Sequence, residues 1–202
     1  MLAIVDYGVG NLYSLSSALN ALSVEHCIAK TPEELHMADR IILPGVGAFA
    51  EAARKLRQSG MQEALVEDAG AGKPVLGICL GMQMLFEASY EYGRHEGLGL
   101  IQGEVCPLID DIEPGLKVPH IGWNRLDIVK DDPLFRYFET GRYVYYVHSY
   151  YAKRCREYTL ATSDYSIPVT GAVRNGSVYG TQFHPEKSGE AGLMLLKAFV
   201  EI

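Results

Sequence analysis

At 202 residues, with 48% hydrophobic and 21% charged residues, the chain has the length and composition of one globular domain with a sizeable core. Its net charge of −7 argues against a nucleic-acid partner or an acidic membrane surface. The start MLAIVDYG has no charged leader region, and no apolar run approaches the roughly 18 residues that span a bilayer, so we expect a cytoplasmic protein with a single domain, 1–202.

The first half of the chain alternates short apolar runs with amphipathic patterns. Strands are predicted at 2–5, 24–29, 39–43 and 74–78. Helices are predicted at 11–22, 48–58, 61–69 and from residue 80 onward, where Met84, Leu85 and Ala88 follow helical spacing. This alternation predicts an α/β fold with a mostly parallel central sheet flanked by helices.

The second half of the chain changes character. Short strand-like pieces occur at 100–130, and the run RYVYYVHSYY at 142–151 is rich in aromatic and β-branched residues. The stretch AVRNGSVYGTQF predicts a hairpin that turns at Asn175-Gly176, and a last helix is expected at 189–201. We therefore expect an antiparallel extension of the parallel sheet.

The stretch VLGICLGMQMLFE at 75–87 places a cysteine between two glycines, where the period of the apolar residues changes. Gly77-Ile78-Cys79-Leu80-Gly81 lies at the predicted strand-to-helix turn and is the cysteine counterpart of the G-x-S-x-G nucleophile elbow. The tight turn strains the nucleophile's backbone, and the two glycines remove Cβ atoms that would clash. Free N–H groups at the start of the following helix favour a thiolate. The alternative is a small buried cysteine in a packed strand.

The three other cysteines lack this setting. Cys27 lies in a predicted strand, Cys106 precedes a proline, and the charged neighbours of Cys155 in KRCRE predict an exposed thiol. Because no C-x-x-C pair occurs, neither a zinc site nor a redox dithiol is expected. We assign no metal and no cofactor from the sequence.

Two glycine-rich segments follow predicted strands. In the first, YGVGNLYS, Tyr13 stands where a dinucleotide fingerprint needs its third glycine. PGVGAFA at 44–50 fits the dinucleotide pattern G-x-G-x-x-A, but the acids about 20 residues further on, Glu67 and Asp68, fall in a helical pattern instead of at a strand end. A loop whose backbone N–H faces an oxyanion suits the segment better. In the serine elbow enzymes one oxyanion donor follows the nucleophile and the other comes from a separate strand-to-helix loop. Here these donors would be Leu80 and the Gly45–Gly47 loop.

A thiol with a pKa of about 8.5 needs a base or a cationic neighbour to act at neutral pH. The candidates are His26, His36, His95, His120, His148 and His184. His184 stands out in TQFHPEKS, because Pro185 favours an extended backbone in which His184 and Glu186 point to the same side. The carboxylate could then orient the imidazole and stabilise its charged form. A surface His-Pro-Glu turn is the alternative.

The pair of motifs GICLGMQ and HPE, about a hundred residues apart, closely resembles the class I glutamine amidotransferases, in which a Cys-His-Glu triad hydrolyses the side-chain amide of glutamine. Further motifs resemble one branch of that family, the glutaminase subunits of imidazole glycerol phosphate synthases. In chain order they are DYGVGN at 6–11, PGVGAF at 44–49, GLGLIQG at 97–103, PHIGWN at 119–124, YVHSY at 146–150 and QFHPEKSG at 182–189.

The resemblance implies a role for each matching position. Cys79 would attack the carboxamide carbon, His184 would transfer protons, and Glu186 would hold His184. Leu80 and the Val46–Gly47 loop would supply oxyanion donors. The resemblance also implies that Gln83 holds the substrate, that Glu91 pairs with the substrate ammonium, and that backbone groups of Ser149 and Tyr150 clamp the amino-acid end.

The same resemblance implies a heterodimer. The partner would be a (β/α)₈-barrel cyclase, which uses the ammonia to make imidazole glycerol phosphate in histidine synthesis. Trp123 and Lys187 would lie near the interface, against the alternatives of a core tryptophan and a solvated surface lysine.

Other functions are compatible with parts of the pattern. A stand-alone cysteine hydrolase would use an elbow cysteine and a histidine, but would need neither HPE nor Gln83. A glutaminase of another synthase would share the triad, although PGVG together with PHIGWN is not expected there. A non-catalytic binding module is disfavoured because all three triad residues are present.

Overall fold

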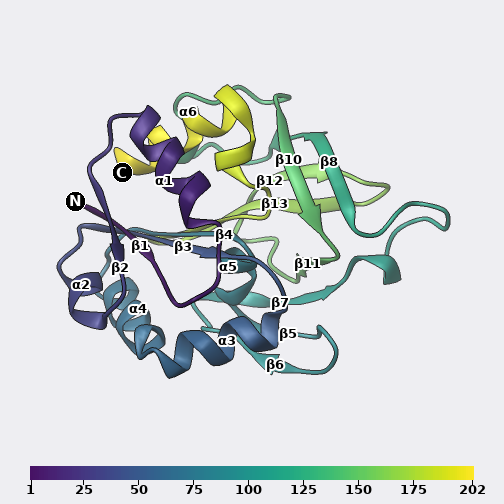
Figure 1. Ribbon diagram of the computed structural model, residues 1–202. Helices are drawn as coiled ribbons and strands as arrows, with labels where there is room; N and C mark the ends of the chain where they lie inside the picture. Colours follow the sequence, from purple (N-terminus) through teal and green to yellow (C-terminus); the bar gives the residue numbers. More distant parts are fainter.

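An eight-stranded sheet forms the centre of the computed structural model, which describes residues 1–202 (Figure 1). Its strand order is β2-β1-β3-β4-β14-β13-β12-β9. The first five strands are parallel and the last three are antiparallel, so the predicted parallel sheet with an antiparallel extension is confirmed. The bounds are β1 Leu2–Val5, β2 His26–Ala29, β3 Arg40–Gly45, β4 Val75–Cys79, β9 Asp127–Ile128, β12 Thr159–Asp164, β13 Pro168–Asn175 and β14 Val178–Thr181.

Helices cover both faces of this sheet (Figure 1). One face carries α1 (Leu12–Ala21) and α6 (Gly189–Val200), and the other carries α2 (Pro32–His36), α3 (Phe49–Gln58) and α4 (Met61–Gly70). Alternate residues of β1 serve the two faces: Leu2 and Ile4 pack in the core that contains α1 and α6, while Ala3 and Val5 pack in the other core. Burial on both faces explains why the strands read as continuous apolar runs.

Two smaller sheets lie beyond the central sheet. The first has the order β11-β7-β5-β6, and the second pairs β10 with β8. Their bounds are β5 Phe86–Ser89, β6 His95–Glu96, β7 Ile101–Pro107, β8 His120–Arg125, β10 Tyr143–His148 and β11 Tyr150–Lys153. The predicted aromatic strand at 142–151 is therefore two strands, which belong to different sheets and meet at Ser149.

The helix that follows Cys79 is shorter than predicted. Helix α5 spans Leu80–Met84, and Ala88 lies in strand β5 instead of in the helix. The cause is tertiary, because the carbonyls of Leu85 and Phe86 accept hydrogen bonds from the 99–101 segment instead of from a continuing helix. The prediction that the helix continues past Met84, which was based on the spacing of apolar residues, is therefore wrong.

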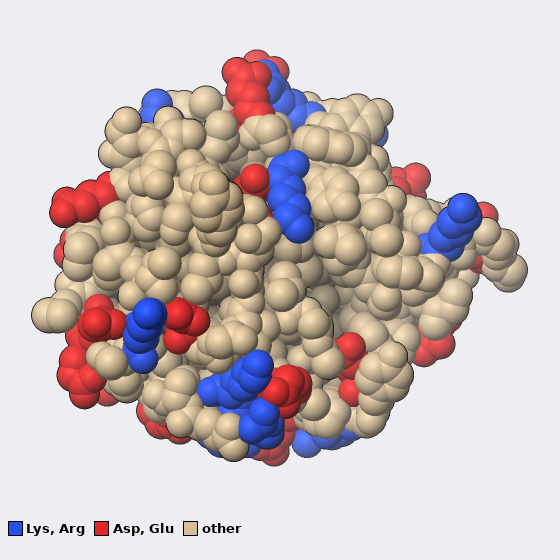
Figure 2. All heavy atoms as spheres, viewed as in Figure 1, with Lys and Arg blue, Asp and Glu red and all other residues tan.

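Charged side chains of both signs are interspersed around the edge of the face seen in Figure 2, where the middle is largely uncharged. None of the helices combines the length and apolar character that a bilayer crossing requires.

Candidate active site

Cys79 ends strand β4 and forms the N-cap of helix α5, with φ of 55° and ψ of −110°. A positive φ at a residue with a side chain costs on the order of 1–3 kcal/mol and is found mainly where function requires it. The sulfur atom lies 3.9 Å from the carbonyl oxygen of Val147 and 3.8 Å from Nε2 of Gln182. The predicted strained elbow is therefore present at the end of strand β4.

The glycines on both sides of Cys79 are required by close backbone packing. A Cβ atom on Gly81 would lie 1.9 Å from the carbonyl oxygen of Leu43 in the neighbouring strand β3. A Cβ atom on Gly77 would lie 2.7 Å from the carbonyl oxygen of Gly81. The steric reason for the G-x-C-x-G pattern is thereby confirmed, although part of the conflict is with strand β3 and not with the elbow itself.

His184 and Glu186 lie just beyond strand β14, on the edge of a 3₁₀ turn at Pro185–Lys187. Nδ1 of His184 lies 2.8 Å from Oε1 of Glu186, and both side chains are nearly inaccessible to solvent. The backbone of His184 is extended, with φ of −95° and ψ of 99°, as predicted from Pro185. Since Nδ1 is engaged by the carboxylate, Nε2 is the ring nitrogen that remains for the thiol.

The charge on His184 follows from this setting. Burial disfavours the imidazolium, but hydrogen bonding and electrostatic attraction to Cys79 and Glu186 outweigh burial and raise the pKa of His184 to about 9. At neutral pH the imidazole is therefore protonated and can serve as a proton donor.

One cavity of about 470 Å³ brings together the predicted residues. Its lining consists of Val46, Gly47, Cys79, Leu80, Gln83, Glu91, Tyr92, Pro119, Val147, His148, Ser149, Tyr150, His184 and Lys187. Glu186 lies behind His184, outside this lining, and Trp123 lies elsewhere on the surface. Every other predicted catalytic, oxyanion and substrate-binding residue reaches the cavity.

The segment with Val46 and Gly47 is held at both ends and free between them. The Tyr7 hydroxyl donates to the carbonyl oxygen of Pro44 at 2.8 Å, and the N–H of Phe49 donates to Glu91 at 2.6 Å. Burial and the neighbouring Cys79 raise the pKa of Tyr7, so the hydroxyl keeps its proton. Gly47 has φ of 90° with open space where a side chain would be, so this segment has room to reorient.

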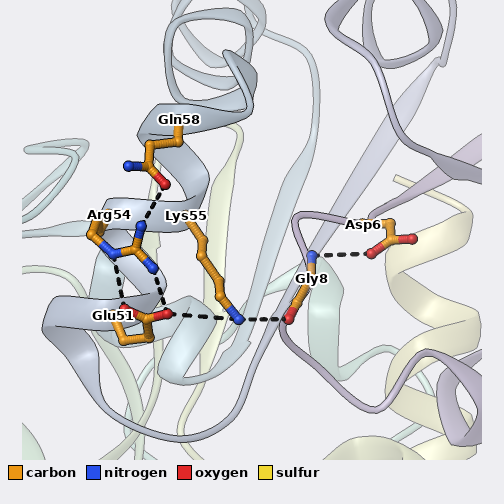
Figure 3. Close-up of polar contacts among 6 residues, drawn as sticks. All are labelled: Asp6, Gly8, Glu51, Arg54, Lys55 and Gln58. Carbon is orange, nitrogen blue, oxygen red and sulfur yellow. Dashed lines mark hydrogen bonds and ion pairs between the residues drawn. The ribbon is translucent and has the colours of Figure 1, made fainter.

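The loop after β1, which carries the DYGVGN motif, is fastened to helix α3 (Figure 3). The Lys55 ammonium donates to the carbonyl oxygen of Gly8 at 3.2 Å and lies 3.7 Å from Glu51, while the N–H of Gly8 donates to Asp6. Because α3 directly follows the Val46–Gly47 segment, this network fixes two of the motifs relative to each other.

Gln83 is engaged by the protein itself. Its Nε2 donates to the carbonyl oxygen of Tyr150 at 3.0 Å and to Oε1 of Gln182 at 3.1 Å. Sequence reasoning did not single out Tyr7 or Gln182, although both lie within quoted motifs. The only sequence feature that pointed to these two residues is their position inside the motifs, because tyrosine and glutamine do not by themselves indicate a catalytic role.

Trp123 lies on an exposed, largely apolar face of the β8–β10 ribbon, and Lys187, at the end of the 3₁₀ turn Pro185–Lys187, lies next to that face. The exposed fractions of the side chains on this face are 55% for Trp123, 58% for Ile121 and 59% for Tyr143. Tyr145 joins the two predicted residues, since its ring lies 6.1 Å from that of Trp123 and 6.0 Å from the Lys187 ammonium. The core-tryptophan alternative is therefore wrong.

Residues 3–202 match the glutamine amidotransferase class-I family. The chain is 50% identical, over its whole length, to imidazole glycerol phosphate synthase subunit HisH of Listeria monocytogenes and covers 96% of that protein. It is also 50% identical to the same subunit of Wolinella succinogenes, with 100% of both chains covered.

Solved structures agree with the fold. A glutamine amidotransferase structure superposes with a TM-score of 0.76 at 20% identity, covering 98% of this chain and 97% of the other. The structure of PurLQS from Thermotoga maritima also gives a TM-score of 0.76 at 20% identity, covering 99% of this chain and 97% of the matched one.

Proposed function

This chain belongs to the class-I glutamine amidotransferases, and we propose that it is the glutaminase subunit of an imidazole glycerol phosphate synthase. The 50% identity to HisH subunits over the full chain supports this choice within the family. The observation that carries the activity is Cys79 at positive φ in the same cavity as His184, with Glu186 hydrogen-bonded to the far side of the imidazole.

The proposed chemistry is hydrolysis of glutamine to glutamate and ammonia through a thioester. The Cys79 sulfur attacks the carboxamide carbon as the thiolate of an ion pair with the protonated His184, which then gives its proton to the nitrogen that leaves as ammonia. His184, now neutral, takes a proton from water as the water oxygen attacks the γ-glutamyl thioester. The intermediate releases the Cys79 thiolate and the carboxylic acid, which loses its proton to solvent as glutamate, and the ion pair is restored. The raised pKa of His184 supports the first step, because the proton donor is already charged at neutral pH.

The remaining cavity residues fit the substrate. The N–H of Leu80, at the first position of helix α5, has no partner within its own helix and is available to an oxyanion together with the Val46–Gly47 segment. The Glu91 carboxylate would pair with the substrate ammonium, and Ser149 and Tyr150 would hold the amino-acid end. Gln83 would hold the substrate from one turn beyond the nucleophile.

The proposed partner is a (β/α)₈-barrel cyclase that consumes the ammonia in histidine synthesis. The relatives are named as subunits, which implies a complex. The exposed face with Ile121, Trp123 and Tyr143 supports a docking surface, because aromatic and aliphatic side chains of this size favour burial. Lys187 links this face to the cavity, since it lies at both.

Substitution of the nucleophile tests the activity. We expect Cys79→Ala to abolish glutamine hydrolysis by the complex of this chain with its cyclase, because no other thiol in the chain lies in the cavity. Glutamate release measures the loss, and partner binding should persist because the substitution removes little core volume. Near-wild-type hydrolysis by the variant would refute the elbow assignment.

Covalent labelling gives an independent check. A glutamine-like diazo-ketone amino acid should modify Cys79, and mass spectrometry of peptides locates the adduct. Cys106 and Cys155 are matched controls within the same chain, because burial raises the pKa of both thiols. Labelling of either control in place of Cys79 would contradict the proposal.

A further inference from the structure

Two buried histidines that the proposed reaction does not use are joined side by side. Nδ1 of His120 lies 3.0 Å from Nε2 of His148. At the far ends, Nε2 of His120 lies 3.4 Å from the Asn124 amide, and Nδ1 of His148 lies 2.9 Å from the carbonyl oxygen of Tyr150. These contacts make a continuous chain from strand β8 to the first residue of strand β11.

The ends of this chain fix the position of every proton in it. A carbonyl oxygen only accepts, so Nδ1 of His148 carries a hydrogen and its Nε2 must accept. Nδ1 of His120 therefore donates to His148, and Nε2 of His120 accepts from the Asn124 amide. Such a directional series is cooperative, because each bond polarises the next.

The surroundings keep both rings neutral and in place. His120 and His148 are almost fully buried, and burial lowers the pKa of His120 to about 4 and that of His148 to about 3. The His120 ring is sandwiched between Tyr165 and Tyr146, with ring centroids 4.1 Å and 4.8 Å away. Neutral rings are what the directional series requires.

The chain ends at a corner of the backbone. At Ser149 the polypeptide leaves the β8–β10 ribbon and enters the other small sheet. The Ser149 carbonyl accepts from Leu108, and the Tyr150 carbonyl accepts from both His148 and Gln83. The Ser149 N–H has no acceptor within the chain, and Ser149 lines the cavity. The carbonyls are thus turned inward, and an N–H is left for a ligand.

We infer that Asn124, His120 and His148 form a hydrogen-bond relay that positions the Ser149–Tyr150 corner to receive the carboxylate of glutamine. The three are positioning residues, since they act through the backbone. The relay begins at Asn124, which follows the exposed Trp123 in strand β8 and lies on the opposite face of that strand. This role rests on the proposed glutaminase function and extends it.

Two substitutions of His120 separate the relay from simple packing. His120→Phe keeps a ring between Tyr146 and Tyr165 but removes the donor to His148, whereas His120→Asn keeps a donor near the Nδ1 position but loses the ring. The relay requires His120→Phe to raise the KM for glutamine about tenfold in the complex with cyclase and bound nucleotide, with kcat changed less. His120→Asn should raise KM less. A packing role requires the reverse order and would overturn the inference.

Tyr165→Phe is the matched control, because it keeps the stacked ring and removes only a hydroxyl that donates to Lys117. Its KM should equal that of the wild type, and Tm values identify any variant that fails to fold. A KM increase equal to that of His120→Phe would attribute the effect to packing.

The relay also has a signature that needs no catalysis. Imidazole ¹⁵N chemical shifts of the isotope-labelled chain should show His148 as the pure Nδ1–H tautomer, and His120→Asn should preserve it. A mixed or Nε2–H tautomer in the wild type would refute the relay itself. A second outcome is possible: His148 is the pure Nδ1–H tautomer, but the Cys79→Ser chain does not bind glutamine. That result would refute the proposed glutaminase function and, with it, the role of the Ser149–Tyr150 corner in binding the substrate carboxylate.

Discussion

The His184 imidazole lies between a sulfur and a carboxylate, and both stabilise its charge. In the proposed mechanism Glu186 only orients and charges the ring, whereas the ring itself moves the protons. We therefore expect Glu186→Gln to retain more glutaminase activity than His184→Ala, measured as glutamate release by the complex. Equal losses would mean that Glu186 has a more direct role, such as contacting the substrate.

The same pair predicts a change in stability at alkaline pH. The folded-state pKa of His184, about 9, lies above its ordinary value of 6.5. The resulting stabilisation is fully present below pH 6.5 and is lost as the pH rises through 9, because the folded state then loses its extra proton. Urea unfolding from pH 6.5 to 9 should show a steeper loss for the wild type than for Glu186→Gln, in which one cause of the raised pKa is gone. Identical slopes would contradict this reading of the pair.

Residue-scale prediction from sequence worked where local chain geometry decides the outcome. The glycines predicted the strained turn at Cys79 and Pro185 predicted the extended backbone at His184, and both backbone conformations are present, while the catalytic roles stay predictions. Cys155 was wrong: its charged neighbours predicted an exposed thiol, yet it is buried against Thr159 and Thr170. Arg154 has φ of 56°, which turns the chain and points Cys155 inward, and the sequence carries no sign of that turn. The relay partners of His148, His120 and Asn124, come from a strand distant in sequence, so their contacts could not be predicted from the sequence either.

At the scale of elements, the contact between α5 and β3 leaves no room for a side chain at Gly81. Because a Cβ atom there would meet the Leu43 carbonyl at 1.9 Å, we expect Gly81→Ala to lower the free energy of unfolding by about 3 kcal/mol or to prevent folding. Gly70→Ala, at the end of α4, has no atom within 4 Å and should change stability by less than about 1 kcal/mol. Chemical denaturation measures both, and a tolerated Gly81→Ala would refute the steric account of the elbow.

Strands β1, β3 and β4 of the first half were predictable because they are buried on both faces. The edge strand β2 is only partly buried and begins later than predicted, and the short helix α2 was not predicted. The second half was harder to predict, because its strands are distributed over three sheets and the local sequence does not indicate to which sheet a strand belongs. Helix α5 shows the same limit: its end is set by hydrogen bonds to residues 99–101 and not by its own sequence.

The neutral histidines of the β8–β10 ribbon make this part of the molecule sensitive to acid. Burial lowers the pKa of His120 to about 4, below its ordinary 6.5, and His148 is lowered by burial, His120 and the charged His184. Between the ordinary pKa of 6.5 and the lowered folded-state values, the unfolded chain binds more protons than the folded chain. The free energy of unfolding is therefore highest above pH 6.5 and falls as the pH drops toward 3. For His120 alone the loss is on the order of 3 kcal/mol.

Urea unfolding between pH 6.5 and 4 tests this effect. His120→Phe removes one of the two groups and should show a shallower dependence on pH than the wild type. Tyr165→Phe, which leaves both imidazoles in place, should keep the wild-type slope. An unchanged slope in His120→Phe would mean that His120 is not held neutral by the fold.

At the scale of the whole molecule, the cavity and the exposed ribbon face are neighbours, and a switch can act between them. Hydrolysis without an acceptor would waste glutamine, and a separate subunit avoids this if its site stays incomplete until the partner is ready. The Val46–Gly47 segment is suited to such a change, because Tyr7 and Glu91 hold its two ends while the glycine between permits a peptide reorientation. We hypothesise that the resting segment points a carbonyl where an N–H is needed and that partner docking turns it.

The isolated chain should therefore be a poor glutaminase, and cyclase with its nucleotide bound should raise the rate strongly. A missing oxyanion donor costs about a hundredfold or more in rate, which is enough for a switch. Steady-state glutamate release by the chain alone, with cyclase, and with cyclase and nucleotide measures the effect. Ile121→Glu, on the ribbon face, should abolish activation, whereas Met37→Glu, at a position that is 70% exposed at the end of α2, should leave it intact. A rate that stays the same in all three conditions would contradict coupling and favour a stand-alone hydrolase.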